Sequence, residues 1–165
     1  MDTREILQAL KLTAQLMELH NENSFKSAAI ANAAYRLGKA HVELDKLSLT
    51  EMEANNLIGK SIAAKIQELQ TSGKLSELES LRNKTPEGII EMLNIKGIGP
   101  KKIAAIWKEL EIESVGELLY ACHENRLVAL KGFGLKTQDQ IKKSIEFSEG
   151  NAGKLHYSYA LEISE

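Results

Sequence analysis

The chain has 165 residues, 43% of them hydrophobic and 27% charged, which suits one ordinary domain or two small ones with a buried core. Its formal net charge of −2 argues against a strongly basic nucleic-acid binder, so any binding to phosphate has to come from local placement of charge. No apolar run approaches the roughly 20 residues that span a bilayer, and residues 1–5 do not lead into a signal peptide, so we expect a cytoplasmic protein without a membrane partner.

Helix-start signals recur from the first residues to position 137. A Ser, Thr or Asp stands before each helical stripe of apolar residues, and an acidic residue often follows three positions later, as in a capping box. The expected caps are Asp2, Ser24, Ser48, Thr85 ahead of Pro86, Ser114 and Thr137. Nearly all of the chain is therefore predicted to be helical.

The C-terminal residues have a different pattern. From 154 to 163 apolar residues alternate with mostly polar ones, which is the period of a β-strand. The rest of the sequence offers this strand no partner. The segment either pairs outside the chain or is the cut end of something larger.

The helical pattern is interrupted at Gly97-Ile98-Gly99-Pro100. The glycines allow a sharp turn and a close approach to another surface, and Pro100 suits the first turn of a new helix. Such a helix begins with unpaired N–H groups and the positive end of its dipole, and Lys101 and Lys102 add full charges there. The turn is therefore suited to receive an anion.

This turn occurs three times, at 57–61 (hairpin one), 97–101 (hairpin two) and 132–136 (hairpin three). Aligned without gaps, the segments place isoleucines 66, 106 and 141 at one position, and each has a lysine in the turn that follows. A corner that served only packing, as in a helical solenoid, would not need those lysines. We predict that the hairpins bind phosphate through these residues: Gly59, Lys60, Gly97, Gly99, Lys101, Lys102, Gly132, Gly134 and Lys136. Leu57 replaces the first glycine of hairpin one, which should weaken that hairpin.

These units are helix-hairpin-helix motifs. Together with SFKS (24–27), GKSIAAKI (59–66), TSGKLSELESL (71–81), KTPEGIIEML (84–93) and LKGFGLKTQDQIKKSI (130–145), they make residues 2–150 resemble the N-terminal region of bacterial X-family DNA polymerases. The resemblance implies an all-α fold of two small subdomains. They would be an eight-kilodalton-like domain at 1–83 with hairpin one and a fingers-like domain at 84–148 with hairpins two and three.

In this family a palm domain with divalent metal ions performs nucleotidyl transfer. Residues 149–165 would lead toward such a palm, so we expect the chain to be a fragment that cannot polymerise alone. The implied function is sequence-independent binding, as a monomer, to gapped or nicked DNA in base excision repair. The implied cofactor is a sodium or potassium ion on the backbone carbonyls of Leu93, Ile95 and Ile98.

A lyase is the alternative function. In animal repair members of the family, the amine of a lysine forms a Schiff base at an abasic site, and Lys65 matches that lysine. Lys26 matches a lysine of the family's 5′-phosphate pocket. The other pocket positions depart from the family, because Ser61 and Glu77 stand where those members have lysines and Ile30 replaces a tyrosine. The other interpretation of Lys65, which we favour, is an ordinary solvated lysine of a helix.

Overall fold

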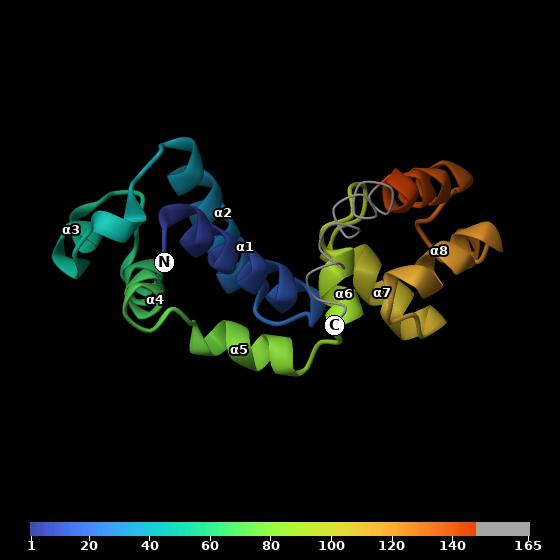
Figure 1. The fold of residues 1–165 in the computed structure, drawn as a ribbon, viewed down its shortest axis with the longest axis horizontal. Helices are drawn as coiled ribbons and strands as arrows, with labels where there is room; N and C mark the ends of the chain where they lie inside the picture. Colours follow the sequence, from blue (N-terminus) through green and yellow to red (C-terminus); the bar gives the residue numbers. More distant parts are fainter. Residues whose placement is uncertain (148–165) are drawn as a thin grey trace, which may run out of the picture. The chain divides into compact units, whose positions relative to one another are not determined.

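A computed structural model describes residues 1–147 of the chain (Figure 1). Its regular elements in that range are helices, so the predicted all-α fold is confirmed. The chain divides into two compact units, one from Met1 to Thr85 and one that begins at Pro86. Within residues 1–147, each helix is too short or too polar to cross a lipid bilayer. The alternating segment 154–163 lies outside the described residues.

Unit one is a small helical bundle. It contains α1 (Thr3–Leu19), α2 (Ser24–Lys39), the 3-10 helix η1 (Leu44–Lys46), α3 (Leu49–Ala54), α4 (Lys60–Ser72) and α5 (Ser76–Asn83). Helix α1 packs along α2 and also contacts α4 and α5. The core is aliphatic, with Leu10, Leu16, Leu37 and Ile66 fully buried. Burial of each such side chain contributes about 1.5–3 kcal/mol to the stability of the fold, so this core holds α2 and α4 against α1.

The capping predictions in unit one are partly confirmed. Asp2 and Ser48 both form capping boxes, each accepting the N–H of the residue three positions on. The prediction for Ser24 is wrong, because the Asn23 side chain accepts the Lys26 N–H at 3.1 Å and Ser24 is already the first helical residue.

The prediction for Thr85 is also wrong. Its hydroxyl donates to the Leu81 carbonyl at 2.7 Å, and its oxygen lies 2.7 Å from His20 Nε2, so the side chain is used within unit one. Pro86 is instead the N-cap of the following helix.

Unit two contains α6 (Glu87–Met92), α7 (Pro100–Leu110), α8 (Val115–His123), the 3-10 helix η2 (Leu127–Ala129) and a helix over 135–147. Ser114 caps α8 as predicted, accepting the N–H of Glu117. The last helix does not start at Thr137. It starts directly after Gly134, whose carbonyl accepts the Gln138 N–H at 3.0 Å, so Thr137 lies inside the first turn.

Candidate functional site

Each hairpin is anchored by the apolar residue at its centre. Ile58, Ile98 and Phe133 are buried, so the turn on either side is held against the core. Gly97 and Gly132, which precede the latter two, have φ of 95° and 88°, a left-handed conformation that favours glycine. Leu57 is not among the residues with positive φ, and its N–H donates to the Asn55 side chain at 2.8 Å. Hairpin one therefore turns differently from the other two.

The second glycine of each hairpin faces open space. A Cβ built on Gly59, Gly99 or Gly134 would meet no atom of residues 1–147, apart from its chain neighbours, within 4 Å. Gly59 and Gly99 have φ of −81° and −100°, which any residue can adopt. Neither internal packing nor backbone strain requires glycine at these two positions. A close approach by something outside the chain would require it.

The same glycines begin the helices that follow. Their carbonyls accept the N–H groups of Ala63, Ile103 and Gln138 at 2.8, 3.1 and 3.0 Å. Gly59 and Gly99 are the N-caps of α4 and α7, and neither helix receives a hydrogen bond from a capping side chain. The N–H groups of these first turns are thus available to an anion, with the helix dipole adding positive potential.

Most of the predicted hairpin lysines are exposed beside these turns, namely Lys60, Lys101 and Lys136. Lys102 is different, because it is half-buried and its Nζ lies 5.5 Å from the centroid of the Phe133 ring in hairpin three. In the other direction, the Ser144 hydroxyl donates to the Lys96 carbonyl just before hairpin two, at 3.3 Å. The residues that flank hairpin two are therefore in contact with hairpin three and with the helix that follows it.

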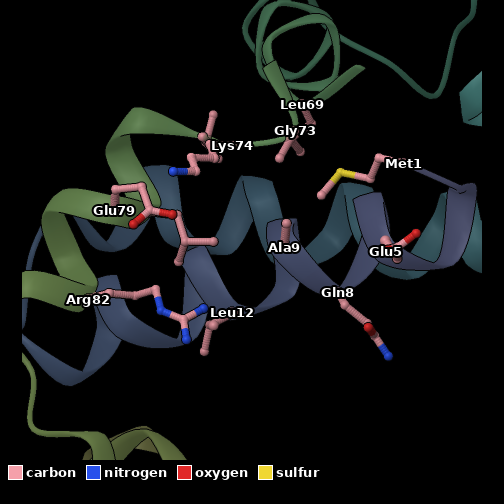
Figure 2. Close-up of a pocket in the computed structure, with 12 residues that line it drawn as sticks. Met1, Glu5, Gln8, Ala9, Leu12, Leu69, Gly73, Lys74, Glu79 and Arg82 are labelled. Atoms are coloured by element: carbon pink, nitrogen blue, oxygen red, sulfur yellow. The ribbon is translucent and has the colours of Figure 1, made fainter. Parts of the chain in front are cut away.

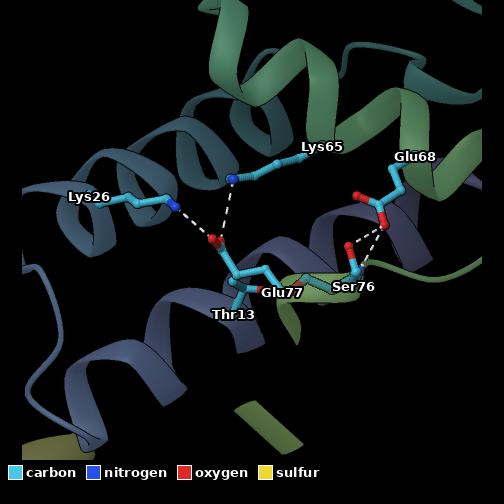
Figure 3. A network of polar contacts seen from close by, with 7 residues as sticks. Thr13, Lys26, Lys65, Glu68, Ser76 and Glu77 are labelled. Atoms are coloured by element: carbon cyan, nitrogen blue, oxygen red, sulfur yellow. Dashed lines mark hydrogen bonds and ion pairs between the residues drawn. The ribbon is translucent and has the colours of Figure 1, made fainter. Parts of the chain in front are cut away.

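In unit one the structure brings Lys26 of α2 and Lys65 of α4 together on Glu77 of α5 (Figure 3). Lys26 Nζ donates to Glu77 Oε2 at 2.5 Å, and Lys65 Nζ lies 3.3 Å from Oε1. Burial by itself would raise the pKa of Glu77, but the Lys26 hydrogen bond and the two ammonium charges together lower it below its ordinary value. Glu77 is therefore a carboxylate at neutral pH.

The start of α5 is positioned by Glu68 of α4. Its Oε2 accepts both the backbone N–H and the hydroxyl of Ser76, at 2.8 and 2.7 Å. These two hydrogen bonds hold the pKa of Glu68 below its ordinary value. Glu77 follows Ser76 directly, and Lys65 lies one turn before Glu68 on α4, so this contact fixes the meeting of Lys65 with Glu77 (Figure 3).

These contacts bear on the lyase alternative. A Schiff base needs a neutral amine, whereas a carboxylate 3.3 Å from Lys65 Nζ stabilises the ammonium form. Ile30, at the position of the family's tyrosine, is buried in the core and Ser61 is exposed. The lyase stays a prediction, which borohydride trapping on abasic-site DNA would test: an adduct that is lost in Lys65→Ala would support it.

The three carbonyls predicted to bind a monovalent cation lie in the connection between α6 and α7. Leu93 is the C-cap residue of α6, and Ile95 and Ile98 follow it before the N-cap Gly99. The cation stays a prediction.

A separate pocket of about 320 Å³ lies in unit one, lined by α1 and by the segment from the end of α4 through α5 (Figure 2). Lys74 and Arg82 line it together with Glu5 and Glu79, so its charges are of both signs. None of the predicted site residues lines it.

Comparisons with known proteins agree with this architecture. A family described as "Helix-hairpin-helix domain" matches residues 1–75, and one described as "SAM-like Helix-hairpin-helix tandem" matches residues 89–146. The DNA polymerase/3′-5′ exonuclease PolX of Bacillus subtilis (strain 168) is 36% identical over 171 residues, covering 99% of this chain and 28% of that protein. The chain thus spans less than a third of that relative's length. The predicted resemblance to the N-terminal region of X-family DNA polymerases is confirmed.

Proposed function

We propose that the chain binds DNA without regard to sequence, as the N-terminal part of an X-family DNA polymerase. The observation that carries the proposal is the open space at Gly59, Gly99 and Gly134, each at the start of a helix and each close to an exposed lysine. A phosphate oxygen can approach a glycine backbone there and accept N–H groups of the first turn. The relative PolX is named as a DNA polymerase, so we take the phosphate that the hairpins bind to be that of DNA.

Sequence independence follows from the chemistry of the contacts. Backbone N–H groups and lysines contact phosphate rather than base edges, so they position the protein without reading the sequence. The experiment is a salt titration of binding to two gapped duplexes of unrelated sequence. We expect affinities within about tenfold of each other at equal salt, and a linear fall of log affinity with log salt concentration. A much larger difference between the two duplexes would contradict the proposal.

The finer proposal is a preference for gapped or nicked DNA, as in repair. It is supported by the division of the chain into two units that each carry a hairpin, because each can contact its own duplex segment beside an interruption. An interrupted duplex also bends more easily than an intact one, which lowers the free energy needed to deform the DNA so that it contacts both units. Affinities for gapped, nicked and intact duplexes of the same sequence test this; equal values would contradict it.

A monovalent cation at hairpin two is the remaining part of the proposal. Neutral carbonyls of Leu93, Ile95 and Ile98 would have to replace the ion's hydration, so the ion should bind well only where a DNA phosphate adds negative charge. Binding in sodium or potassium should therefore exceed binding in a bulky organic cation at equal ionic strength. Identical affinities would count against the ion.

A further inference from the structure

Two lysines of unit one converge on a single carboxylate. The side chain of Lys65 is only 12% exposed, and Lys26 and Glu77 are about one-third exposed at 38% and 31%. The three side chains come from three helices, α2, α4 and α5, whose backbones are fixed by the core (Figure 3). The ammonium groups are therefore held near each other by the fold, and Glu77 is the anion between them.

The carboxylate fits this position incompletely. Glu77 Oε2 accepts a hydrogen bond from Lys26 at 2.5 Å, whereas the Oε1 atom, which is shielded from solvent, lies 3.3 Å from the Lys65 ammonium. The contact with Lys65 is therefore longer than a good charge-assisted hydrogen bond of about 2.7–2.9 Å. Two ammonium groups around one anion also leave a net positive charge. A phosphate group, with more oxygens and in its monoester form more charge, would satisfy both lysines better than a carboxylate does.

We propose that Glu77 is a built-in anion that closes a phosphate-binding position between Lys26 and Lys65. Its charge repels a phosphate that approaches the two ammonium groups, and its side chain occupies the space between them. In the wild-type chain this position then adds little to DNA affinity, which is left to the hairpins. The inference rests on the proposed DNA binding for its biological meaning, while the anion site itself can be tested without DNA.

The first test uses inorganic phosphate and thermal unfolding. Glu77→Gln keeps the shape of the side chain and removes its charge. We expect phosphate to raise the Tm of Glu77→Gln, compared with chloride at equal ionic strength, and to leave the Tm of the wild type unchanged. Adding Lys26→Ala should abolish the gain. The matched control is Glu22→Gln, which frees Lys84 from an exposed single ion pair in the same unit and should create no phosphate site.

The second test uses gapped DNA with either a 5′-phosphate or a 5′-hydroxyl at the gap. Glu77→Gln should bind at least one of them about fivefold more tightly than the wild type, a gain of about 1 kcal/mol, which is the upper end for an exposed charge pair. A gain on both DNAs would identify an internal phosphodiester as the ligand. A gain confined to the first would identify a terminal phosphate monoester.

Two results with a folded Glu77→Gln would overturn the proposal. One is a folded Glu77→Gln that shows no gain with inorganic phosphate or with either DNA. The other is a wild type that already responds to phosphate and loses the response in Glu77→Gln, since Glu77 would then orient the lysines rather than block them.

Should the variant not fold, an NMR titration of the wild type tests the proposal instead. Sulfate stays a dianion over the pH range in which Glu77 titrates, and it should compete with the Glu77 carboxylate for the two ammonium groups. Sulfate should therefore raise the pKa of Glu77 relative to chloride, and an unchanged pKa would contradict the proposal. A wild type that binds no DNA would refute the proposed function and leave the phosphate test intact.

Discussion

The ammonium of Lys102, in the first turn after hairpin two, lies 5.5 Å from the centre of the Phe133 ring in hairpin three. A cation above an aromatic face contributes about 0.5–1 kcal/mol at such a site. The Ser144 hydroxyl makes the reciprocal connection to the Lys96 carbonyl before hairpin two. Each hairpin is thus in contact with the helix that follows the other.

The two lysines of hairpin two should therefore behave differently. Lys101→Ala should weaken DNA binding moderately and lower the salt slope by about one counterion. Lys102→Ala should also loosen hairpin three, so its effect should couple to that of Lys136→Ala. Double-mutant cycles of DNA affinity would measure this. We expect Lys101 with Lys136 to be additive within about 0.5 kcal/mol and Lys102 with Lys136 to be non-additive. Additivity in both cycles would contradict the coupling.

Gly88 in α6 is required by packing. A Cβ on this residue would lie 1.9 Å from the backbone carbonyl oxygen of Glu113. Gly88→Ala should therefore destabilise unit two by about 1–3 kcal/mol, the cost of overpacking a filled site. Gly116→Ala in α8 is the control, since its Cβ would approach nothing closer than 4.0 Å and alanine favours helix. Denaturant unfolding measures both, and equal stabilities would contradict this account.

Glu77 should make stability fall in acid. Its pKa in the folded chain lies below the ordinary 4.5, although burial opposes this, because Lys26 and Lys65 stabilise the carboxylate. The ion pairs therefore stabilise the fold at neutral pH, and this contribution is lost as the pH falls through the folded pKa. Glu77→Gln should be less stable than the wild type at neutral pH and should approach it in acid. If the difference in unfolding free energy between the wild type and Glu77→Gln stayed constant from pH 7 to 3, the Glu77 carboxylate would not stabilise the fold in this way.

The thiol of Cys122 should be unreactive in the folded chain. Burial raises its pKa from 9.0 to about 11, with Lys142 opposing the rise and Glu146 adding to it. The thiolate is the reacting form, so this shift lowers its population about a hundredfold at a given pH. Alkylation near pH 8 should be slow in the native chain and fast in denaturant. Equal rates in the two conditions would contradict the burial of this side chain.

Local signals in the sequence predicted the caps at Asp2, Ser48 and Ser114, because a cap and the N–H that it accepts are only three positions apart. The failure at Ser24 came from a neighbour, Asn23, that caps equally well. Thr85 failed for another reason, since its hydroxyl contacts Leu81 and lies beside His20, 65 residues away in sequence. Such a contact depends on how α1 packs against α5, which no local pattern contains.

The candidate site likewise has a part that the sequence predicts and a part that depends on how the helices pack. The glycines and lysines of the hairpins were visible as a repeat, because a turn and the helix start after it are contiguous in sequence. The pairing of Lys26 with Glu77 joins residues 51 apart, and that of Lys102 with Phe133 joins two hairpins. The sequence indicated only that an acid stands at position 77. That this acid holds both lysines follows from the packing of α2, α4 and α5.

The central claim is that the second glycine of a hairpin leaves room for phosphate. Gly99→Val tests it most directly, because a Cβ at this position would meet no described residue beyond its chain neighbours within 4 Å, and φ here is −100°. Gly59→Val is the matched control in hairpin one, where Leu57 already alters the turn. The measurement is a salt titration of gapped-DNA binding for both variants, with helicity checked by circular dichroism. We predict that Gly99→Val abolishes most of the affinity while remaining folded, and that Gly59→Val has a smaller effect. A folded Gly99→Val that binds like the wild type, or that binds better than Gly59→Val, would contradict the account.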